Sequence, residues 1–178
     1  MKSKAGPIRE LTRGIRPRAR TGEMRPLASR GVFSNGVKVF SLGVSGLGLE
    51  KRIKFIANQI LIFFKKEKHS LEVYLIDGRR MRFINRRFRG KDAPTNVLSF
   101  EAVSPKLFFE VKKGGERGIK DLGEVYLCPS FISRRGEKLE RLLIHGILHL
   151  LHYQHDKKND TIVMERLEAK IFKKFGID

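Results

Sequence analysis

The sequence predicts a layered α/β (α+β) domain with a mixed central sheet of about four to five strands and helices packed against it. Apolar residues recur every three to four positions in some stretches, as in helices, and every second position in others, as in strands. Strand-like and helix-like stretches alternate along the chain, which favours layers of sheet and helix. A length of 178 residues with 40% hydrophobic residues is enough for one core. We therefore expect a single domain over residues 37–178.

The first expected elements are a strand and a long helix. The run VKVFSLGV (37–44) is strand-like and leads into turn residues rich in glycine. The stretch LEKRIKFIANQILIFFKKEKH (49–69) has apolar residues at spacings of three and four, as in a helix buried along one face. Those apolar residues are Ile53, Ile56, Ala57, Ile60, Phe63 and Phe64.

The middle of the chain is predicted to be mainly strands. LEVYLID (71–77) alternates as a strand, and Arg79 to Arg87 could form a short helix. The further strand-like runs are VLSFE (97–101), possibly LFFEV (107–111), and EVYLC (124–128), with Pro129 just beyond the last.

The C-terminal part predicts two helices. Residues 137–151 have Leu139, Leu142, Leu143, Ile147, Leu148 and Leu151 at helical spacing. Residues 161–175 form a second such run. A metal site is expected at the end of the first of these helices, for reasons given below.

The front segment, residues 1–36, differs in composition from the rest. It has nine Lys or Arg and two Glu, mixed with Pro, Gly and Ser, and shows no apolar period, so we expect disorder in isolation. An RNA-binding arm is the favoured interpretation because of its charge. A true start at Met24, or nearby, is an alternative. An organellar presequence is disfavoured because Pro7 and Pro17 would interrupt an amphipathic helix.

Charge and cysteine content indicate partners and compartment. The net charge of +19 indicates a polyanionic partner such as nucleic acid, without choosing RNA over DNA. The single cysteine, Cys128, allows no internal disulfide and is interpreted as a small buried residue. No apolar run of about 18 residues and no secretory signal core is present. We expect a soluble cytoplasmic protein with no membrane association.

Four of the five histidines lie in HGILHLLHYQHD (145–156). His145 and His149 are four residues apart on the predicted helix, so their rings project from one face about 6 Å apart. A catalytic metal needs a third protein ligand, which His152 or His155 could supply. His152 would lie in line along a continuing helix, where three donors cannot converge. If the helix ends near His152, His155 can fold back, which favours the set 145, 149 and 155.

Three imidazoles suit one Zn²⁺ ion per chain, although nickel or copper could also occupy such a site. The opposing interpretation is that these are ordinary surface or core histidines, since pairs four residues apart are common in helices. The density of histidines in this one segment favours a metal site.

Three ordered motifs give the sequence a family resemblance. HGILHLLHYQH is similar to the motif H-G-x-L-H-L-x-G-Y-D-H of the YbeY-type endoribonucleases, whose members act in ribosomal RNA maturation. INRRFRGKDAPTNVLSF (84–100) resembles the family's segment with an arginine before K-D-x-P-T-x-V-L-S-F. DLGEVYLCP (121–129) resembles its L-G-D-I-x-I-C strand. The resemblance covers about residues 37–178 and leaves the front segment unmatched.

The resemblance implies that His145, His149 and His155 bind zinc and that Arg89 is an active-site residue. It implies a single-strand-specific endoribonuclease of ribosomal RNA processing, with ribosomal RNA or a ribosomal subunit as partner. Zinc would activate water and polarise phosphate, and Arg89 would stabilise the charge that develops on phosphorus. Thr95, Asn96 and Ser99 are candidate polar neighbours. The oligomeric state is not predicted.

Two positions depart from the family motif. His152 stands where the family has glycine, which indicates a turn with positive φ that histidine adopts at some cost. We expect the turn to be kept, with His152 as a structural substitution or as a spare or proton-transferring imidazole. Gln154 replaces an aspartate and removes a carboxylate that could support a ligand.

Two other function classes are considered. An RNA-binding ribosome assembly factor with structural zinc and little catalysis would be favoured if His152 closed the site as a fourth ligand. A metalloprotease is disfavoured, because Gly146 stands where H-E-x-x-H enzymes have their catalytic Glu.

Overall fold

The structure is a computed structural model, and the residues that it describes are 36–44, 47–102, 121–155 and 158–177. The chain divides into two units, Met1–Val32 and Phe33–Asp178, and every described element belongs to the second. The expected front segment, apart from Gly36, and the possible strand at 107–111 lie outside the described residues. None of the described helices is both long and apolar enough to cross a bilayer.

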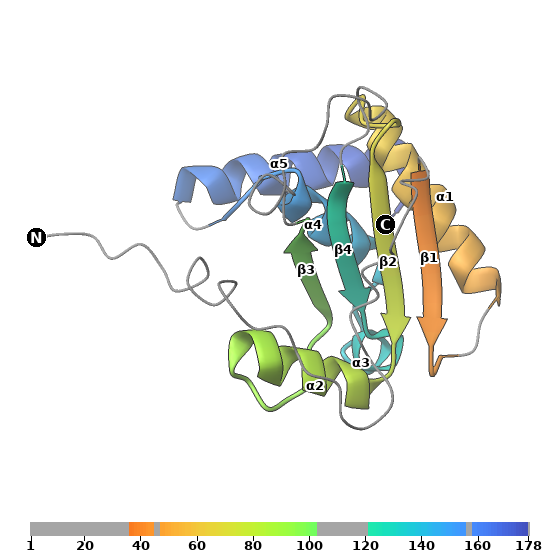
Figure 1. The fold of residues 1–178 in the computed structure, drawn as a ribbon. Helices are drawn as coiled ribbons and strands as arrows, with labels where there is room; N and C mark the ends of the chain where they lie inside the picture. Colours follow the sequence, from red (N-terminus) through yellow and green to blue (C-terminus); the bar gives the residue numbers. More distant parts are fainter. Residues whose placement is uncertain (1–35, 45–46, 103–120, 156–157, 178) are drawn as a thin grey trace, which may run out of the picture. The chain divides into compact units, whose positions relative to one another are not determined.

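A four-stranded mixed sheet is the centre of the fold, as predicted. Its strands are β1 (Gly36–Leu42), β2 (Ser70–Ile76), β3 (Val97–Glu101) and β4 (Asp121–Leu127), in the order β1-β2-β4-β3 (Figure 1). The pairs β1·β2 and β2·β4 are parallel, and β3 runs antiparallel to β4. Strand β3 therefore forms one edge of the sheet, beside the helix that carries the histidines.

Helices cover the sheet in two groups. Helices α1 (Leu47–Phe63), α4 (Leu139–Leu150) and α5 (Lys158–Phe175) lie behind the sheet in Figure 1 and contribute to the larger core. Helices α2 (Gly78–Arg89) and α3 (Pro129–Arg134) lie where β2 and β4 end. Helix α2 adds Met81 and Ile84 to a second cluster, against Tyr74, Leu98 and Tyr126 on the other face of the sheet.

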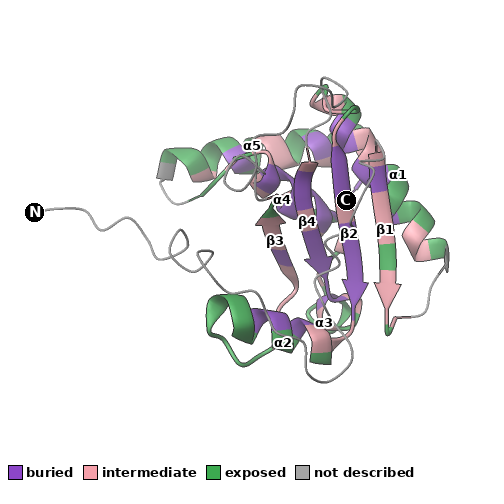
Figure 2. Ribbon diagram, in the orientation of Figure 1, coloured by how far each residue is buried: buried purple, intermediate pink, exposed green. Residues whose placement is uncertain are grey.

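Strand β2 is buried along nearly its whole length, on both faces of the sheet (Figure 2). Leu71, Val73 and Leu75 belong to the larger core, and Tyr74 and Ile76 belong to the second cluster. Strand β2 lies between β1 and β4 and is parallel to both, and central strands of this kind are commonly buried on both faces.

The predicted helices are confirmed, with ends that differ by no more than three residues, except at the end of α1. This helix ends at Phe63, six residues before the end of the predicted stretch 49–69, and the chain takes a positive φ at Lys65 just beyond it. Helix α3 was not predicted: Pro129 was expected only to follow the strand, and it is instead the first residue of this helix. Proline suits the first helical turn, where its missing N–H has no partner to lose. Six residues are too few to show a helical apolar period, so the sequence gives little signal for α3.

A candidate metal centre beside an open hollow

Helix α4 holds two of the predicted ligands at the border between core and solvent. Leu143, Ile144, Ile147 and Leu148 are fully buried on its inner side. His145 and His149, one turn apart, are half-buried. The apolar face thus fixes the rotation of the helix, and both imidazoles lie along the same side of it.

Gly146 lets α4 approach the sheet closely, directly beside His145. A Cβ atom at this position would lie 2.9 Å from both Ser99 Oγ of β3 and Val125 Cγ1 of β4. These distances are shorter than carbon side chains tolerate. A glutamate at 146, as the H-E-x-x-H proteases require, would therefore force β3 and β4 to shift, which supports the sequence argument against peptide hydrolysis.

The chain leaves α4 through a left-handed turn at His152. Its φ is +67°, which confirms the expected turn at the position where the family has glycine. The N–H of His152 donates to the carbonyl of His149 (2.9 Å), and the N–H of Tyr153 donates to that of Leu148 (3.0 Å). The turn redirects the chain, so His155 folds back toward α4.

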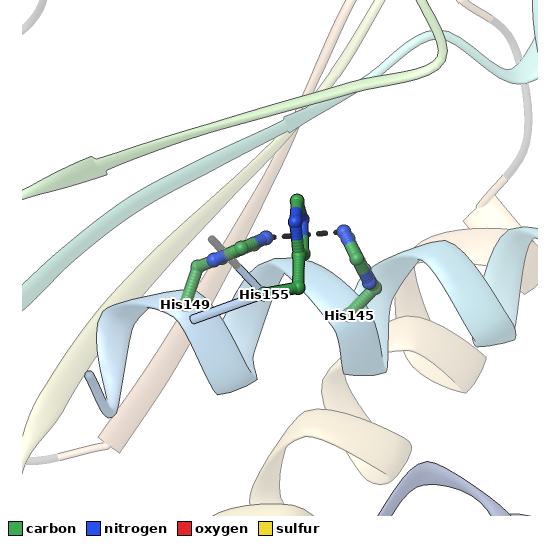
Figure 3. A group of neighbouring side chains, drawn as sticks. All are labelled: His145, His149 and His155. Carbon is green, nitrogen blue, oxygen red and sulfur yellow. Dashed lines mark hydrogen bonds between the residues drawn. The ribbon is translucent and has the colours of Figure 1, made fainter. Parts of the chain in front are cut away.

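The structure brings together His145, His149 and His155, the set that the sequence favours. One nitrogen from each ring lies within 4.8 Å of the others, and the Nε2 atoms of His145 and His149 are 3.1 Å apart. Figure 3 shows the three rings gathered on one side of α4, with His155 between the other two. His152 is outside this group, and its Nδ1 lies 3.3 Å from Glu101 Oε1 at the end of β3.

The surroundings of His149 favour its neutral imidazole, which can donate a lone pair. Burial lowers the pKa of His149, and the neighbouring His145 and His155 lower this pKa further. Glu168 of α5 places Oε1 2.8 Å from Nδ1 of His145. With the proton on Nδ1 donated to this carboxylate, Nε2 of His145 keeps a lone pair directed toward the other two histidines.

Glu168 is a site residue that the sequence reasoning missed. It follows buried Met164 by four positions and precedes buried Ile171 by three, so it lies on the apolar side of α5. An acidic residue in line with apolar positions is the signal that could have identified it. The three imidazoles, supported by this carboxylate, form a donor set that fits a divalent transition metal.

An open hollow of about 370 Å³ lies beside His145 and is lined by Asn96, Val97, Arg141, Leu142, His145, Glu168 and Phe172. A neighbouring hollow of about 510 Å³ shares Arg141 and Leu142 with it. The Arg141 guanidinium lies 4.7 Å over the Phe172 ring. The candidate metal centre therefore borders a concave surface that presents a cation, a group that can bind a phosphate or another anion.

Two of the three predicted polar neighbours lie on this side of the sheet. Asn96 lines the hollow, where its Nδ2 donates to Glu137 Oε2 (3.2 Å) and its Oδ1 accepts from the N–H of Val97 (2.8 Å). Ser99 faces Gly146. Thr95 does not line the hollow, and its hydroxyl donates to Asn96 Oδ1 (3.2 Å).

Arg89 is the predicted site residue that the structure leaves apart from the histidines. It is the last residue of α2, it is exposed, and it forms no ion pair with any described residue. A short loop joins it to the start of β3, whereas His152 contacts the opposite end of that strand. Its role at the site therefore stays a prediction.

Comparisons with known proteins identify the family of the chain. The family described as endoribonuclease YbeY matches residues 44–176. An endoribonuclease YbeY from Stenotrophomonas maltophilia (strain K279a) is 34% identical over 119 residues, covering 61% of this chain and 70% of the relative. One from Alcanivorax borkumensis is 36% identical over 117 residues, covering 60% and 63% respectively.

A relative of the same name from Sinorhizobium medicae is 33% identical over 137 residues, covering 72% of this chain and 77% of its own. The solution structure of TM1509 from Thermotoga maritima is a weaker match, with a TM-score of 0.45 and 23% identity over 78% of this chain and 91% of that one. On the strength of the family match over residues 44–176 and of these sequence relatives, the chain belongs to the endoribonuclease YbeY family.

Proposed function

We propose that the chain is a zinc-dependent endoribonuclease that cleaves single-stranded RNA during ribosomal RNA maturation, with residues 37–178 as the catalytic domain. The observation that carries this proposal is the convergence of His145, His149 and His155, in a member of a family whose relatives are named endoribonucleases. One of these histidines, His145, also contacts the carboxylate of Glu168. The formal net charge of +19 favours a nucleic acid as substrate.

The three histidines would hold the ion, which when bound supplies a Lewis acid that activates water and polarises a phosphate oxygen. Glu168 orients His145 through Nδ1, and the turn at His152 positions His155. Arg141 offers a cation in the hollow next to His145. These groups bind and orient an RNA phosphate at the concave surface.

Arg89 is proposed to bind the phosphate at which charge develops. Its guanidinium has no ion-pair partner among the described residues, so both of its outer nitrogens can form a fork with phosphate oxygens. The resemblance of residues 84–100 to the family's segment with an arginine before K-D-x-P-T, rather than a contact with the histidines, supports this role.

The alternative, an assembly factor with a closed structural zinc, needs a fourth protein ligand. His152 is the residue expected to supply it, and its ring faces Glu101 instead. The geometry therefore favours a site with room for substrate.

The test combines metal analysis with cleavage of a labelled single-stranded RNA and of its duplex, with and without chelator. We expect about one zinc per chain and cleavage of the single strand, which stops with chelator and resumes with added zinc. Arg89→Lys should keep zinc and lose most cleavage, because a point charge cannot replace the fork. Arg134→Lys, at an exposed arginine of α3, is the control. Cleavage that is insensitive to chelator would contradict the proposal.

A further inference from the structure

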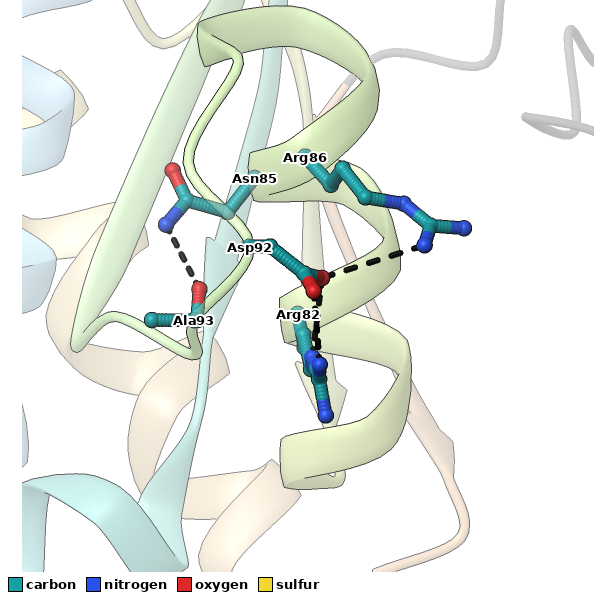
Figure 4. Close-up of polar contacts among 5 residues, drawn as sticks. All are labelled: Arg82, Asn85, Arg86, Asp92 and Ala93. Carbon is teal, nitrogen blue, oxygen red and sulfur yellow. Dashed lines mark hydrogen bonds and ion pairs between the residues drawn. The ribbon is translucent and has the colours of Figure 1, made fainter.

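Helix α2 presents an arginine-rich surface to solvent. Its twelve residues, GRRMRFINRRFR, include six arginines and no acidic residue. Its buried residues are Met81, Ile84 and Asn85, and Asn85 Nδ2 donates to the carbonyl of Ala93 (2.7 Å; Figure 4). These contacts fix which side of α2 faces the protein, so the opposite side is available to a partner.

A phenylalanine stands in the middle of that opposite side. Phe83 is 50% exposed, and Arg79 and Arg87 lie one helical turn before and after it. Phe88 is similarly exposed but packs on Phe100, with ring centroids 4.9 Å apart. Phe83 makes no ring contact with any described residue. No ring contact within the described residues therefore accounts for an aromatic side chain at position 83.

The arginines around this ring divide into two groups. Arg82 donates twice to Asp92 (2.9 and 2.6 Å), and Arg86 lies 3.9 Å from the same carboxylate, as Figure 4 shows. Arg79 and Arg87 form no ion pair with the part of the chain that the structure describes. We call Arg79, Phe83 and Arg87 the α2 stripe: an exposed ring between two cations that lack an acidic partner there.

We propose that the α2 stripe binds single-stranded RNA, with Phe83 stacked on an unpaired base and with Arg79 and Arg87 on the flanking phosphates. The choice of RNA as the polyanion rests on the proposed function. Single strands expose base faces between regularly spaced anions, and an aromatic ring flanked by cations is complementary to both. A duplex hides its base faces, and an apolar protein surface would bury the two arginines without partners.

The first experiment uses the absence of tryptophan from the chain. Phe83→Trp places the sole tryptophan in the α2 stripe, and Phe55→Trp places one on α1, where Phe55 is 63% exposed. Each variant is titrated in EDTA with a 12-nucleotide single-stranded RNA, its duplex, and polyglutamate. We expect the single strand to quench the emission at position 83 and protect it from iodide, with little effect at position 55. The duplex and polyglutamate should change neither signal.

The second experiment measures affinity for the same single strand in EDTA. Phe83→Ala and Phe83→Leu should each weaken binding about fivefold or more, as expected for one lost base stack, while Phe83→Trp retains it. Leucine keeps the apolar bulk but not the aromatic face, so it separates stacking from a hydrophobic contact. Arg79→Ala and Arg87→Ala should each reduce the salt dependence of binding.

Three results would overturn the proposal: equal responses at positions 83 and 55, quenching by polyglutamate as strong as by RNA, or unchanged affinity in Phe83→Ala. Quenching by polyglutamate would assign the surface to an acidic protein instead. Binding is measured without metal, so its outcome is independent of cleavage. If the protein cleaves RNA and Phe83→Ala binds RNA normally, only the proposal for the α2 stripe is wrong. If the ring at position 83 stacks on RNA and the protein cleaves no RNA, only the proposed function is wrong.

Discussion

His152 holds a backbone conformation that glycine adopts without steric penalty. At φ +67° a side chain costs about 1–2 kcal/mol, and glycine loses part of that advantage through its more flexible unfolded state. We expect His152→Gly to keep zinc and to gain about 0.5–1 kcal/mol in the free energy of unfolding. Urea denaturation and metal analysis measure the two quantities.

His155→Ala is the matched comparison, and it should lose zinc and cleavage together because too few donors remain. The opposite pattern, with zinc lost in His152→Gly and kept in His155→Ala, would make 145, 149 and 152 the ligand set.

Glu168 is expected to act as a positioning residue for His145. Glu168→Gln should weaken zinc binding about tenfold, because an uncharged amide supports the imidazole less well than a carboxylate. A competition titration against a chelator measures this affinity. Excess zinc should restore kcat, which it would not do if Glu168 acted directly on the substrate. Glu165→Gln, at an exposed position of the same helix, should leave zinc affinity unchanged.

At the scale of elements, the fit of α4 against the sheet depends on Gly146. Helix propensity alone would favour Gly146→Ala by about 1 kcal/mol. The new methyl group would meet Ser99 Oγ and Val125 Cγ1 at 2.9 Å, and displacing β3 and β4 is expected to cost about 1–3 kcal/mol. Thermal denaturation should therefore show a loss of stability.

Gly78→Ala provides the control for that substitution, because Gly78 is also helical and a methyl group there would meet no other side chain or strand within 4 Å. It should be neutral or stabilising. Equal losses in the two variants would show that helix geometry, and not contact with the sheet, decides the result.

Strand β4 contains a carboxylate whose ionisation opposes folding. Burial raises the pKa of Glu124, while the hydroxyl of Tyr126, which donates to it at 2.7 Å, lowers this pKa in part. Because the folded-state pKa lies above the unfolded value, stability falls as pH rises from about 4.5 through the folded-state pKa. Glu124→Gln should raise Tm near pH 7 and flatten its dependence on pH.

Melting curves between pH 4.5 and 7.5 test this expectation, with Glu67→Gln at an exposed position as control. A glutamine oxygen still accepts from Tyr126, so the hydrogen bond is kept. A lower Tm at pH 7 would show that the carboxylate stabilises the strand.

The sequence predicts elements better than it predicts the contacts between them. VLSFE was predicted as a strand with the bounds that β3 has, because its apolar and polar residues alternate and it is bounded by turn residues. The order β1-β2-β4-β3 could not be predicted, since no local pattern records which distant strands pair.

The same distinction applies to the site. The three histidines lie within eleven residues, and helix geometry predicts that His145 and His149 meet. The expected end of the helix near His152 is what favoured His155 as the third member of the group. Glu168 reaches His145 from 23 residues away, and that contact depends on how α5 packs on α4. Long-range packing, not residue chemistry, is what sequence reasoning missed.

At the scale of the whole molecule, charge determines the expected affinity for RNA. Residues 1–35 carry nine of the 38 Lys and Arg. Deleting them should weaken RNA binding and flatten its dependence on salt, since fewer counterions are released from phosphates, while cleavage chemistry persists. Binding isotherms at several salt concentrations measure the slope. An unchanged slope would favour a presequence or a misplaced start.

The short spacing of the histidines also determines how strongly metal binding would stabilise the folded state. A ring closed over so few residues loses little chain entropy, even when the remainder of the molecule is unfolded. The denatured chain can therefore bind the same ion, although without Glu168 and without the preformed turn at His152. Because binding to both states cancels part of the stabilisation by mass action, an ion at this site would stabilise the fold by less than its affinity for the folded chain suggests.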